Sequence, residues 1–265
     1  MGKRIAYLGP PGTFTEEAAL LYDKGAQFIP VPTIPGVASA VSSGMADEGV
    51  VPIENSLEGS VTDTLDLLIH DSPLLISKEL VLPVGHQLLV KPGTVISDVK
   101  VLYSHPQSLG QCRRFVERIL PRADVVAALS NAAAVQDMME TPTPSAAIGT
   151  RRAAELYGAE ILAKEIQDQV SNVTRFVVLA AEDHPPTGND KTSICFSFDD
   201  DRPGSLVEVL QEFSQRGINL TKVESRPSKE SLGRYFFLID LEGHRQDATV
   251  SEALDDVRGK ASLFK

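Results

Sequence analysis

The chain has 265 residues, 42% of them hydrophobic and 23% charged, with a formal net charge of −11 at pH 7. This length exceeds that of most single domains, so two or three units are expected. The acidic balance argues against nucleic acid and anionic membranes as partners, because both attract clustered lysine and arginine. A site for an anionic ligand would therefore have to be locally positive.

The amino-terminal stretch MGKRIAYLGPPG has a five-residue apolar run before its Gly-Pro turn. That run is too short for the apolar segment of a signal peptide, and no other run approaches the length of a membrane span. Cys112 and Cys195 fall in different predicted units and offer neither a disulfide framework nor a metal ligand set. We therefore expect a cytoplasmic protein that holds no metal.

The first 180 residues alternate short β-like runs with helical patterns. Strands are predicted at 4–8, 27–31, 49–53, 99–103, 125–128, 146–148 and 176–180, and helices near 16–22, 36–43, 61–70, 106–119, 131–139 and 150–157. Such alternation predicts an α/β unit with largely parallel sheets. Residues 74–90 lack helical breaks and are typical of two long crossover strands. We therefore predict two lobes, one of about 1–80 with 166–181 and one of about 85–165, with a ligand cleft between them.

A Pro- and Gly-rich linker is predicted at 182–190, where the alternation stops. Beyond it, strands are predicted at 192–198, 219–226, 234–241 and 261–264, with helices at 204–216 and 248–257. This order describes a small α+β unit of βαββαβ type over 191–265, with a ferredoxin-like fold. A unit of this size tends to bury its remaining apolar surface against a partner.

Three predicted helix entrances carry polar residues that could hold an anion. They lie in GPPGTFTEEA (9–18), PIENSLEGSVTDTLDLL (52–68) and YSHPQSLGQCRRF (103–115). Unpaired N–H groups at a helix start bind anions, although capped helices without a ligand are common. In the third entrance, Gln107 and Gln111 share one helical face and Ser104 lies just upstream, at the carboxyl end of a strand. This arrangement suits a polar ligand, and surface glutamines are the alternative.

The sequence lacks the motifs that are typical of several types of reaction. It has no GxSxG, GxGxxG or P-loop element, and no histidine–cysteine–carboxylate cluster for a metal. His105 lies near the third entrance, whereas His70, His86, His184 and His244 are scattered and are predicted to be solvated. Redox and nucleotide chemistry are therefore not expected, and no cofactor is predicted.

Thr174 and Arg175 precede the buried strand predicted at 176–180 and follow a polar Ser-Asn-Val segment. A charge so close to a core strand needs a partner. The partner of Arg175 is either a protein carboxylate or a ligand.

Taken together, YLGPPGTFTEEAA, VPIENSLEGSVTDTLDLL, SHPQSLGQC and SNVTRF, in that order, resemble the prephenate dehydratase family. The tail, with RPGSLVEVL and NLTKVESRP, resembles the ACT regulatory domain that is fused to that enzyme. The resemblance covers nearly the whole chain, and four motifs in order are far more specific than any one of them. It implies a catalytic unit like a periplasmic binding protein, no cofactor, and inhibition by L-phenylalanine.

The resemblance also implies roles for particular residues in a carbon–oxygen lyase. Thr174 would lie at the departing hydroxyl of prephenate, Arg175 would pair with a substrate carboxylate, and Phe176 would support the loop. A threonine hydroxyl has too high a pKa to act as a stoichiometric acid, so Thr174 would donate a hydrogen bond or relay a proton, with His105 as a possible ultimate donor. Four further side chains are expected to contact the substrate: Asn55, Ser104, Gln111 and, less strongly supported, Thr13. Ser56, beside Asn55, is a further candidate.

In the second unit the resemblance implies an effector site for L-phenylalanine between two protomers. Its predicted residues open a helix on one side and lie on a strand on the other: Gly204, Ser205, Leu206, Asn219, Leu220, Glu224, Ser225, Arg226 and Pro227. A homodimer is implied and a homotetramer is possible. Without the resemblance, these segments would read as a turn and an edge strand. The chain ends at Lys265, where relatives continue for several residues, and this puts the regulation in question.

Two other functions remain open at this point. The same dehydration could act on arogenate, which carries an amino acid in place of the keto acid. Alternatively, the chain could be a non-catalytic amino-acid sensor with binding-protein-like lobes. The retention of Thr174 and Arg175 together with Asn55, Ser104 and Gln111 favours the enzyme.

Overall fold

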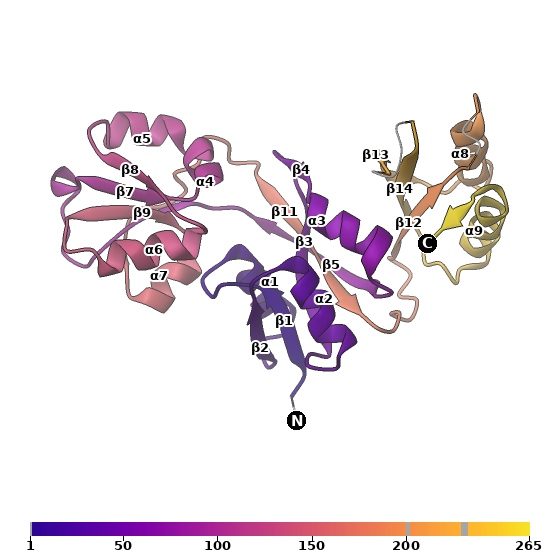
Figure 1. Cartoon of the computed structure of the whole chain (residues 1–265), viewed down its shortest axis with the longest axis horizontal. Coiled ribbons are helices and arrows are strands. Elements are labelled where there is room, and N and C mark those ends of the chain that lie inside the picture. Colours follow the sequence, from indigo (N-terminus) through magenta and orange to yellow (C-terminus); the bar gives the residue numbers. More distant parts are fainter. Residues whose placement is uncertain (1, 200–201, 229–232) are drawn as a thin grey trace. The chain divides into compact units, whose positions relative to one another are not determined.

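The structure is a computed structural model that describes residues 2–199, 202–228 and 233–265. It divides into two compact units, Met1–Asp183 and His184–Lys265 (Figure 1). None of the helices within the described ranges is long and apolar enough to cross a membrane. The predicted α/β class, with a two-lobed first unit and a small βαββαβ second unit, is confirmed.

The first lobe is built on a sheet of order β2-β1-β3-β11-β5, with the short β4 paired to β3. Its strands are β1 (Arg4–Leu8), β2 (Gln27–Val31), β3 (Glu48–Asn55), β4 (Gly59–Ser60), β5 (Leu75–Pro83) and β11 (Val173–Ala180). Its helices are α1 (Phe14–Tyr22), α2 (Ile34–Ser42) and α3 (Thr62–Asp66), which continues as a π-turn over Leu67–Asp71. β1 runs parallel to β2 and β3, whereas β11 is antiparallel to both β3 and β5. Fully buried Ile5, Tyr7 and Phe176 belong to its core.

The second lobe has a sheet of order β10-β6-β9-β7-β8. Its strands are β6 (Gln87–Val90), β7 (Val101–Ser104), β8 (Asp124–Ala127), β9 (Ser145–Gly149) and β10 (Glu160–Ala163). Its helices are α4 (Pro106–Gln111), α5 (Arg113–Ile119), α6 (Asn131–Glu140) and α7 (Arg151–Tyr157), with a 3-10 turn at Ile96–Asp98. The prediction of a single helix at 106–119 is wrong. The helix is interrupted at Cys112, two residues after Gly110, a residue type that weakens helices.

The chain passes between the lobes twice, in segments that we call the first crossing (residues 83–87) and the second crossing (residues 163–173). The crossings are hydrogen-bonded to each other, from Val84 N to Asn172 O at 2.9 Å and from Ile166 N to His86 O at 3.0 Å. A polar side chain on either crossing therefore lies where the two lobes meet.

A second contact joins the lobes at the start of α1. Thr150 Oγ1 donates to Gly12 O at 2.8 Å, and Arg152 pairs with Glu16 at 3.1 Å. Gly12 has φ +89°, and a Cβ there would lie 3.2–3.3 Å from the side chains of Ala132 and Ala153. Only glycine both adopts this backbone and allows the lobes to approach so closely.

The second unit contains β12 (Lys191–Ser197), α8 (Ser205–Gln215), β13 (Leu220–Pro227), β14 (Tyr235–Glu242), α9 (Ala248–Lys260) and β15 (Leu263–Phe264). Its sheet has the order β13-β14-β12-β15 and is antiparallel throughout. Phe196, Phe213 and Ile239 are buried in the core between the sheet and its helices.

Both cysteines are buried free thiols, Cys112 in the second lobe and Cys195 on β12. Burial raises the pKa of each thiol to about 12. Since the thiolate is the reactive form, neither side chain is a nucleophile near neutral pH.

Candidate active site

The pairing of β3 with β11 brings Asn55 and Thr174 together. These residues face each other in the antiparallel register, and Asn55 Nδ2 donates to Thr174 Oγ1 at 2.9 Å. Thr174 is only 9% exposed. The two predicted site residues, more than a hundred positions apart in sequence, are thus held by one sheet.

The orientation of the Asn55 amide is set by the backbone of the following turn. Its Oδ1 accepts from Leu57 N at 3.0 Å and from Glu58 N at 3.1 Å. Its Nδ2 therefore faces the other way, toward Thr174 and toward Asn172 Oδ1 at 2.8 Å. Asn172 lies on the second crossing and is 1% exposed.

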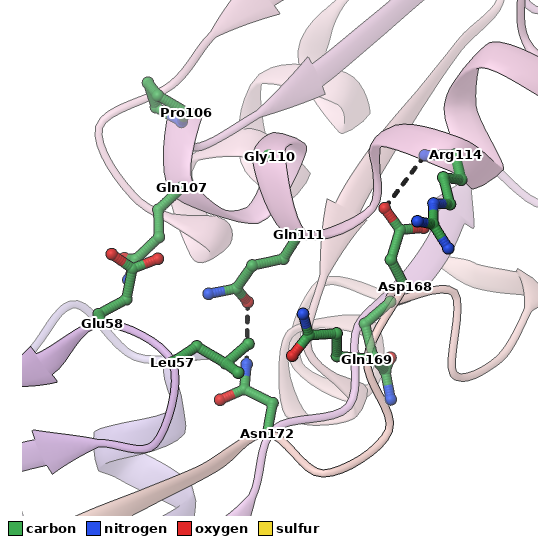
Figure 2. Close-up of a pocket in the computed structure, with 11 residues that line it drawn as sticks. Leu57, Glu58, Pro106, Gln107, Gly110, Gln111, Arg114, Asp168, Gln169 and Asn172 are labelled. Atoms are coloured by element: carbon green, nitrogen blue, oxygen red, sulfur yellow. Dashed lines mark hydrogen bonds between the residues drawn. The ribbon is translucent and has the colours of Figure 1, made fainter.

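Gln111, the last residue of α4, extends this network into the second lobe. Its Oε1 accepts from Asn172 Nδ2 at 3.0 Å and lies 2.9 Å from His86 Nε2. Figure 2 shows the contact of Gln111 with Asn172 at the wall of a cavity. Predicted site residues from the two lobes, Gln111 and Asn55, are therefore joined through Asn172.

His86, on the first crossing, contradicts its predicted solvation, because it is only 2% exposed. Burial lowers its pKa, and its ring meets the Phe14 ring edge-on at 5.7 Å between centroids. The same prediction is wrong for His244 in the second unit, which is 6% exposed with Nε2 bonded to His184 O at 2.8 Å. His70 is exposed as expected.

A cavity of about 400 Å³ lies beside this network, between the turn after β3, helix α4 and the second crossing (Figure 2). Its lining is rich in amides and includes charges of both signs: Leu57, Glu58, Pro106, Gln107, Gly110, Gln111, Arg114, Gln167, Asp168, Gln169 and Asn172. Gln107 and Gln111 do line one space, as their spacing predicts. Such a lining can hold a small polar molecule by many hydrogen bonds. In the described part of the chain, no three His, Cys, Asp or Glu side chains gather as a metal site requires.

Arg175, next to Thr174 on β11, has protein carboxylates as partners. Its Nε lies 2.6 Å from Glu79 Oε2 and its guanidinium 3.7 Å from Glu54. Successive side chains of a strand point to opposite faces, so Arg175 leaves the strand on the side away from Thr174. Its predicted contact with a substrate carboxylate stays a prediction, and that carboxylate would compete with Glu79.

The remaining predicted residues of the first unit have varied surroundings. Thr13 caps α1, with Oγ1 accepting from Glu16 N at 3.4 Å. Ser104, 1% exposed at the end of β7, donates to His105 O at 3.0 Å. Ser56 is exposed and exchanges hydrogen bonds with the backbone of the second crossing. Phe176 is a core residue of the first lobe. None of these four joins the network of Asn55, Thr174, Asn172, Gln111 and His86 through a hydrogen bond shown here.

Two network residues, His86 and Asn172, were missed by the sequence analysis. Both are polar side chains on crossings, and both are almost fully buried. A signal was present for His86, because it interrupts LPVGHQLLV between two apolar strands, where a buried polar group must find partners. Asn172 had no such signal, since its Ser-Asn-Val context reads as a loop.

In the second unit, the predicted effector residues lie at two places. Gly204, with φ +101°, immediately precedes α8, and an added Cβ there would have no atom of the described residues within 4 Å. Ser205 is buried and Leu206 half-buried. Leu220 and Glu224–Pro227 lie on β13, at the edge of the sheet, and Lys222 pairs with Glu224 at 3.1 Å. Asn219 directly precedes this strand, and its O accepts from Glu242 N at 2.9 Å.

Comparison with known proteins assigns each of the two units to a family. The family model described as prephenate dehydratase matches residues 5–184, and the ACT domain model matches residues 200–259. The prephenate dehydratase of Mycolicibacterium smegmatis is 43% identical over 265 residues, which cover 95% of this chain and 84% of the relative.

Solved structures of similar proteins cover almost all of the chain. The prephenate dehydratase of Arthrobacter aurescens, in complex with L-Phe, superposes with a TM-score of 0.91 at 37% identity, over 99% of this chain and 88% of that one. GqqA, described as a novel type of quorum quenching acylase, superposes with a TM-score of 0.89 at 29% identity, over 99% of this chain and 96% of that one. The chain belongs to the prephenate dehydratase family and ends in an ACT domain.

Proposed function

We propose that the protein is a prephenate dehydratase, which converts prephenate to phenylpyruvate, carbon dioxide and water. The observation that carries this proposal is the hydrogen bond from Asn55 to a nearly buried Thr174 beside an amide-lined cavity, in a chain of this family. In this reaction the bond to the ring carboxylate breaks and its electron pair enters the ring. The C4–oxygen bond breaks as the ring becomes aromatic, and the hydroxyl leaves as water after it gains a proton.

Aromatisation supplies most of the driving force, so the protein has to hold a dianion and help the hydroxyl leave. A hydrogen bond that strengthens as negative charge develops on the departing oxygen would lower the barrier. We assign this bond to the Thr174 hydroxyl, which donates a hydrogen bond or relays a proton, because its pKa is far too high for a stoichiometric acid.

The other residues would orient the substrate. Asn55 and Gln111 present amides within the network, and Ser104 lies just upstream of α4. Arg175 would offer its guanidinium to a carboxylate, in exchange for Glu79. Thr13 and Ser56 are weaker candidates for substrate contacts, and Phe176 supports β11 from the core.

We further propose that L-phenylalanine binds the ACT domain and inhibits the enzyme. L-Phe is present in the structure of the Arthrobacter aurescens relative, and the open backbone at Gly204 would let a ligand approach the amides that start α8. The site would be completed by β13 of a second copy, in a cytoplasmic homodimer or homotetramer. Binding must favour a less active arrangement of the catalytic unit for inhibition to follow.

The first experiment measures phenylpyruvate release from prephenate by the purified full chain, with and without millimolar L-phenylalanine. Turnover that phenylalanine suppresses is expected. Turnover without suppression would keep the enzyme and overturn the effector assignment. Turnover of arogenate but not prephenate would reassign the substrate, and inactivity on both would favour the sensor. An acylase activity, as in the name of GqqA, is checked with an acylated amine as substrate.

A further inference from the structure

His86 ends the hydrogen-bond network that leads to Thr174. It is 2% exposed, its Nε2 lies 2.9 Å from Gln111 Oε1, and its buried Nδ1 has no hydrogen-bond partner among the residues that the structure describes. Its backbone is fixed as well, because His86 N donates to Gln167 Oε1 at 3.0 Å and His86 O accepts from Ile166 N at 3.0 Å. The buried imidazole of His86 therefore uses Nε2 in the network, whereas Nδ1 takes no part in it.

The direction of every hydrogen bond in the network follows from two backbone amides. Leu57 N and Glu58 N can only donate, so the side-chain atom of Asn55 that they contact must be its oxygen. Asn55 Nδ2 then donates to Asn172 Oδ1, which leaves Asn172 Nδ2 to donate to Gln111. The atom of Gln111 that receives this bond is therefore its oxygen, Oε1.

This direction decides which nitrogen of His86 carries the proton. Gln111 Oε1 can only accept, so His86 Nε2 must be the donor. With a neutral ring, Nδ1 is then an unprotonated lone pair, which agrees with its lack of a partner. The opposite tautomer would bury an unsatisfied N–H and oppose two lone pairs at 2.9 Å, and both are costly.

The same direction decides the role of the Thr174 hydroxyl. The lone pair of Asn55 Nδ2 is delocalised into the amide and cannot accept a hydrogen bond, so Thr174 Oγ1 must accept from this nitrogen. The hydroxyl proton of Thr174 is not used in that bond and remains available to a second oxygen. A hydrogen bond that the oxygen already accepts also strengthens the one that the hydroxyl donates.

We propose that His86 is a positioning residue for the dehydration. It fixes Gln111 and Asn172 and, through Asn55, holds Thr174 as a donor to the departing hydroxyl. This inference rests on the proposed function and deepens it, because it explains how a side chain with no substrate contact shown here would keep Gln111, Asn172 and Asn55 in the positions that leave the Thr174 hydroxyl free to donate. The chain of contacts also spans both lobes, so it is complete only while Gln111 and Asn172 remain together.

The tautomer provides a test that does not depend on activity. In protein labelled with ¹⁵N-histidine, the His86 signals are assigned by their absence from the His86→Gln variant. We expect a ring protonated at Nε2 and unprotonated at Nδ1 near neutral pH. A ring protonated only at Nδ1 would overturn the proposal, even if the protein proves inactive on prephenate.

Kinetics on prephenate test the positioning role itself, once turnover of the unaltered protein has been established. His86→Leu removes the donor and should lower kcat about tenfold or more with a smaller change in KM, because misplaced catalytic groups cost rate. His86→Gln can place an amide N–H near the position of Nε2 and should recover most of that loss. Equal losses in His86→Leu and His86→Gln would contradict the role.

A double-mutant comparison separates positioning from simple packing. Because His86 acts through Asn172, His86→Leu should lower kcat further by less than about twofold in an Asn172→Ala background. Losses that multiply would show that His86 acts independently of the network and would overturn the proposal. If His86→Leu does not fold, the same comparison is made with His86→Phe, and the ¹⁵N measurement still decides the tautomer.

Discussion

The two units of the chain assemble their predicted sites differently. In the first unit, residues from β3, β11, α4 and both crossings meet in one continuous set of hydrogen bonds. In the second unit, Gly204 opens a helix, and Glu224–Pro227 lie on β13 at the edge of the sheet. The proposed catalytic site is thus assembled within one chain, whereas the proposed effector site has one part at the start of α8 and one on β13, an arrangement that would suit completion by a second copy.

Among the substitutions that test this comparison, Thr174→Ala is expected to have the largest effect on activity. If the hydroxyl serves the transition state, kcat on prephenate should fall by roughly 100-fold or more. Thr174→Ser keeps a hydroxyl and is the matched control, which should retain most activity. A loss below about tenfold in Thr174→Ala would remove Thr174 from the catalytic residues.

Asn55→Asp tests whether the hydrogen-bond network of the first unit contributes to turnover, in addition to the Thr174 hydroxyl itself. The carboxylate can still accept from Leu57 N and Glu58 N but cannot donate to Thr174, and it faces Asn172 Oδ1 with a charge. We expect kcat to fall about tenfold or more. Ser77→Ala, which removes another side-chain bond to β11 at Val178 O, is the matched control. Unchanged kcat in Asn55→Asp would disconnect the network from catalysis.

Gly204→Ala addresses the second unit. A Cβ at φ +101° strains the backbone that opens α8, so half-inhibition should need about tenfold more L-phenylalanine. Gly217→Ala is the matched control, because Gly217 has φ +67° and equally open surroundings at the other end of α8. Equal shifts in both variants would mean that the strain alone weakens the response and that Gly204 has no special place in the effector site.

The smallest effect that we expect is on the pH dependence of stability, and it arises from His86 in the first unit. Burial lowers the pKa of His86 in the folded protein, although the hydrogen bond with Gln111 and the charge of the Glu165 carboxylate raise it in part. The unfolded chain therefore binds more protons than the folded one as the pH falls below the ordinary histidine value of about 6.5, and stability is lost in that range.

This loss can be read from urea unfolding at about pH 8 and about pH 5.5. The unaltered protein should lose more free energy of unfolding between these conditions than His86→Gln does. His70→Gln, at an exposed position, is the control and should lose as much as the unaltered protein. The opposite sign for His86→Gln would mean that the folded state favours the charged imidazole.

Much of the fold could be predicted because the local patterns agree with the tertiary structure. The strands β1 and β2 have the predicted bounds, and the βαββαβ order of the second unit is clear from periodicity and from the break at Gly204. The strand β10 was missed, because Glu160–Ala163 is short and only half-buried. The sequence predicts one helix through Cys112, because this apolar residue has the spacing of the buried helix face and gives no sign that the helix is interrupted there.

The site could be predicted only in part. Thr174, Asn55 and Gln111 were found from motifs, and the structure connects them. The burial of His86 and Asn172 could not be read from their neighbours, since it arises where two crossings distant in sequence pair with each other. The partners of Arg175 were hidden for a similar reason, because Glu54 and Glu79 lie on the two strands that flank β11.

The two buried cysteines have a practical consequence. With both native thiols out of reach and their pKa raised to about 12, a maleimide dye near neutral pH would find no reactive sulfur in the unaltered fold. A pair of cysteines introduced at exposed positions, such as Lys24 in the first lobe and Arg122 in the second, could therefore carry a donor and an acceptor dye without removal of native residues. Energy transfer between the dyes would report any change in the distance between the lobes when prephenate or phenylalanine is added.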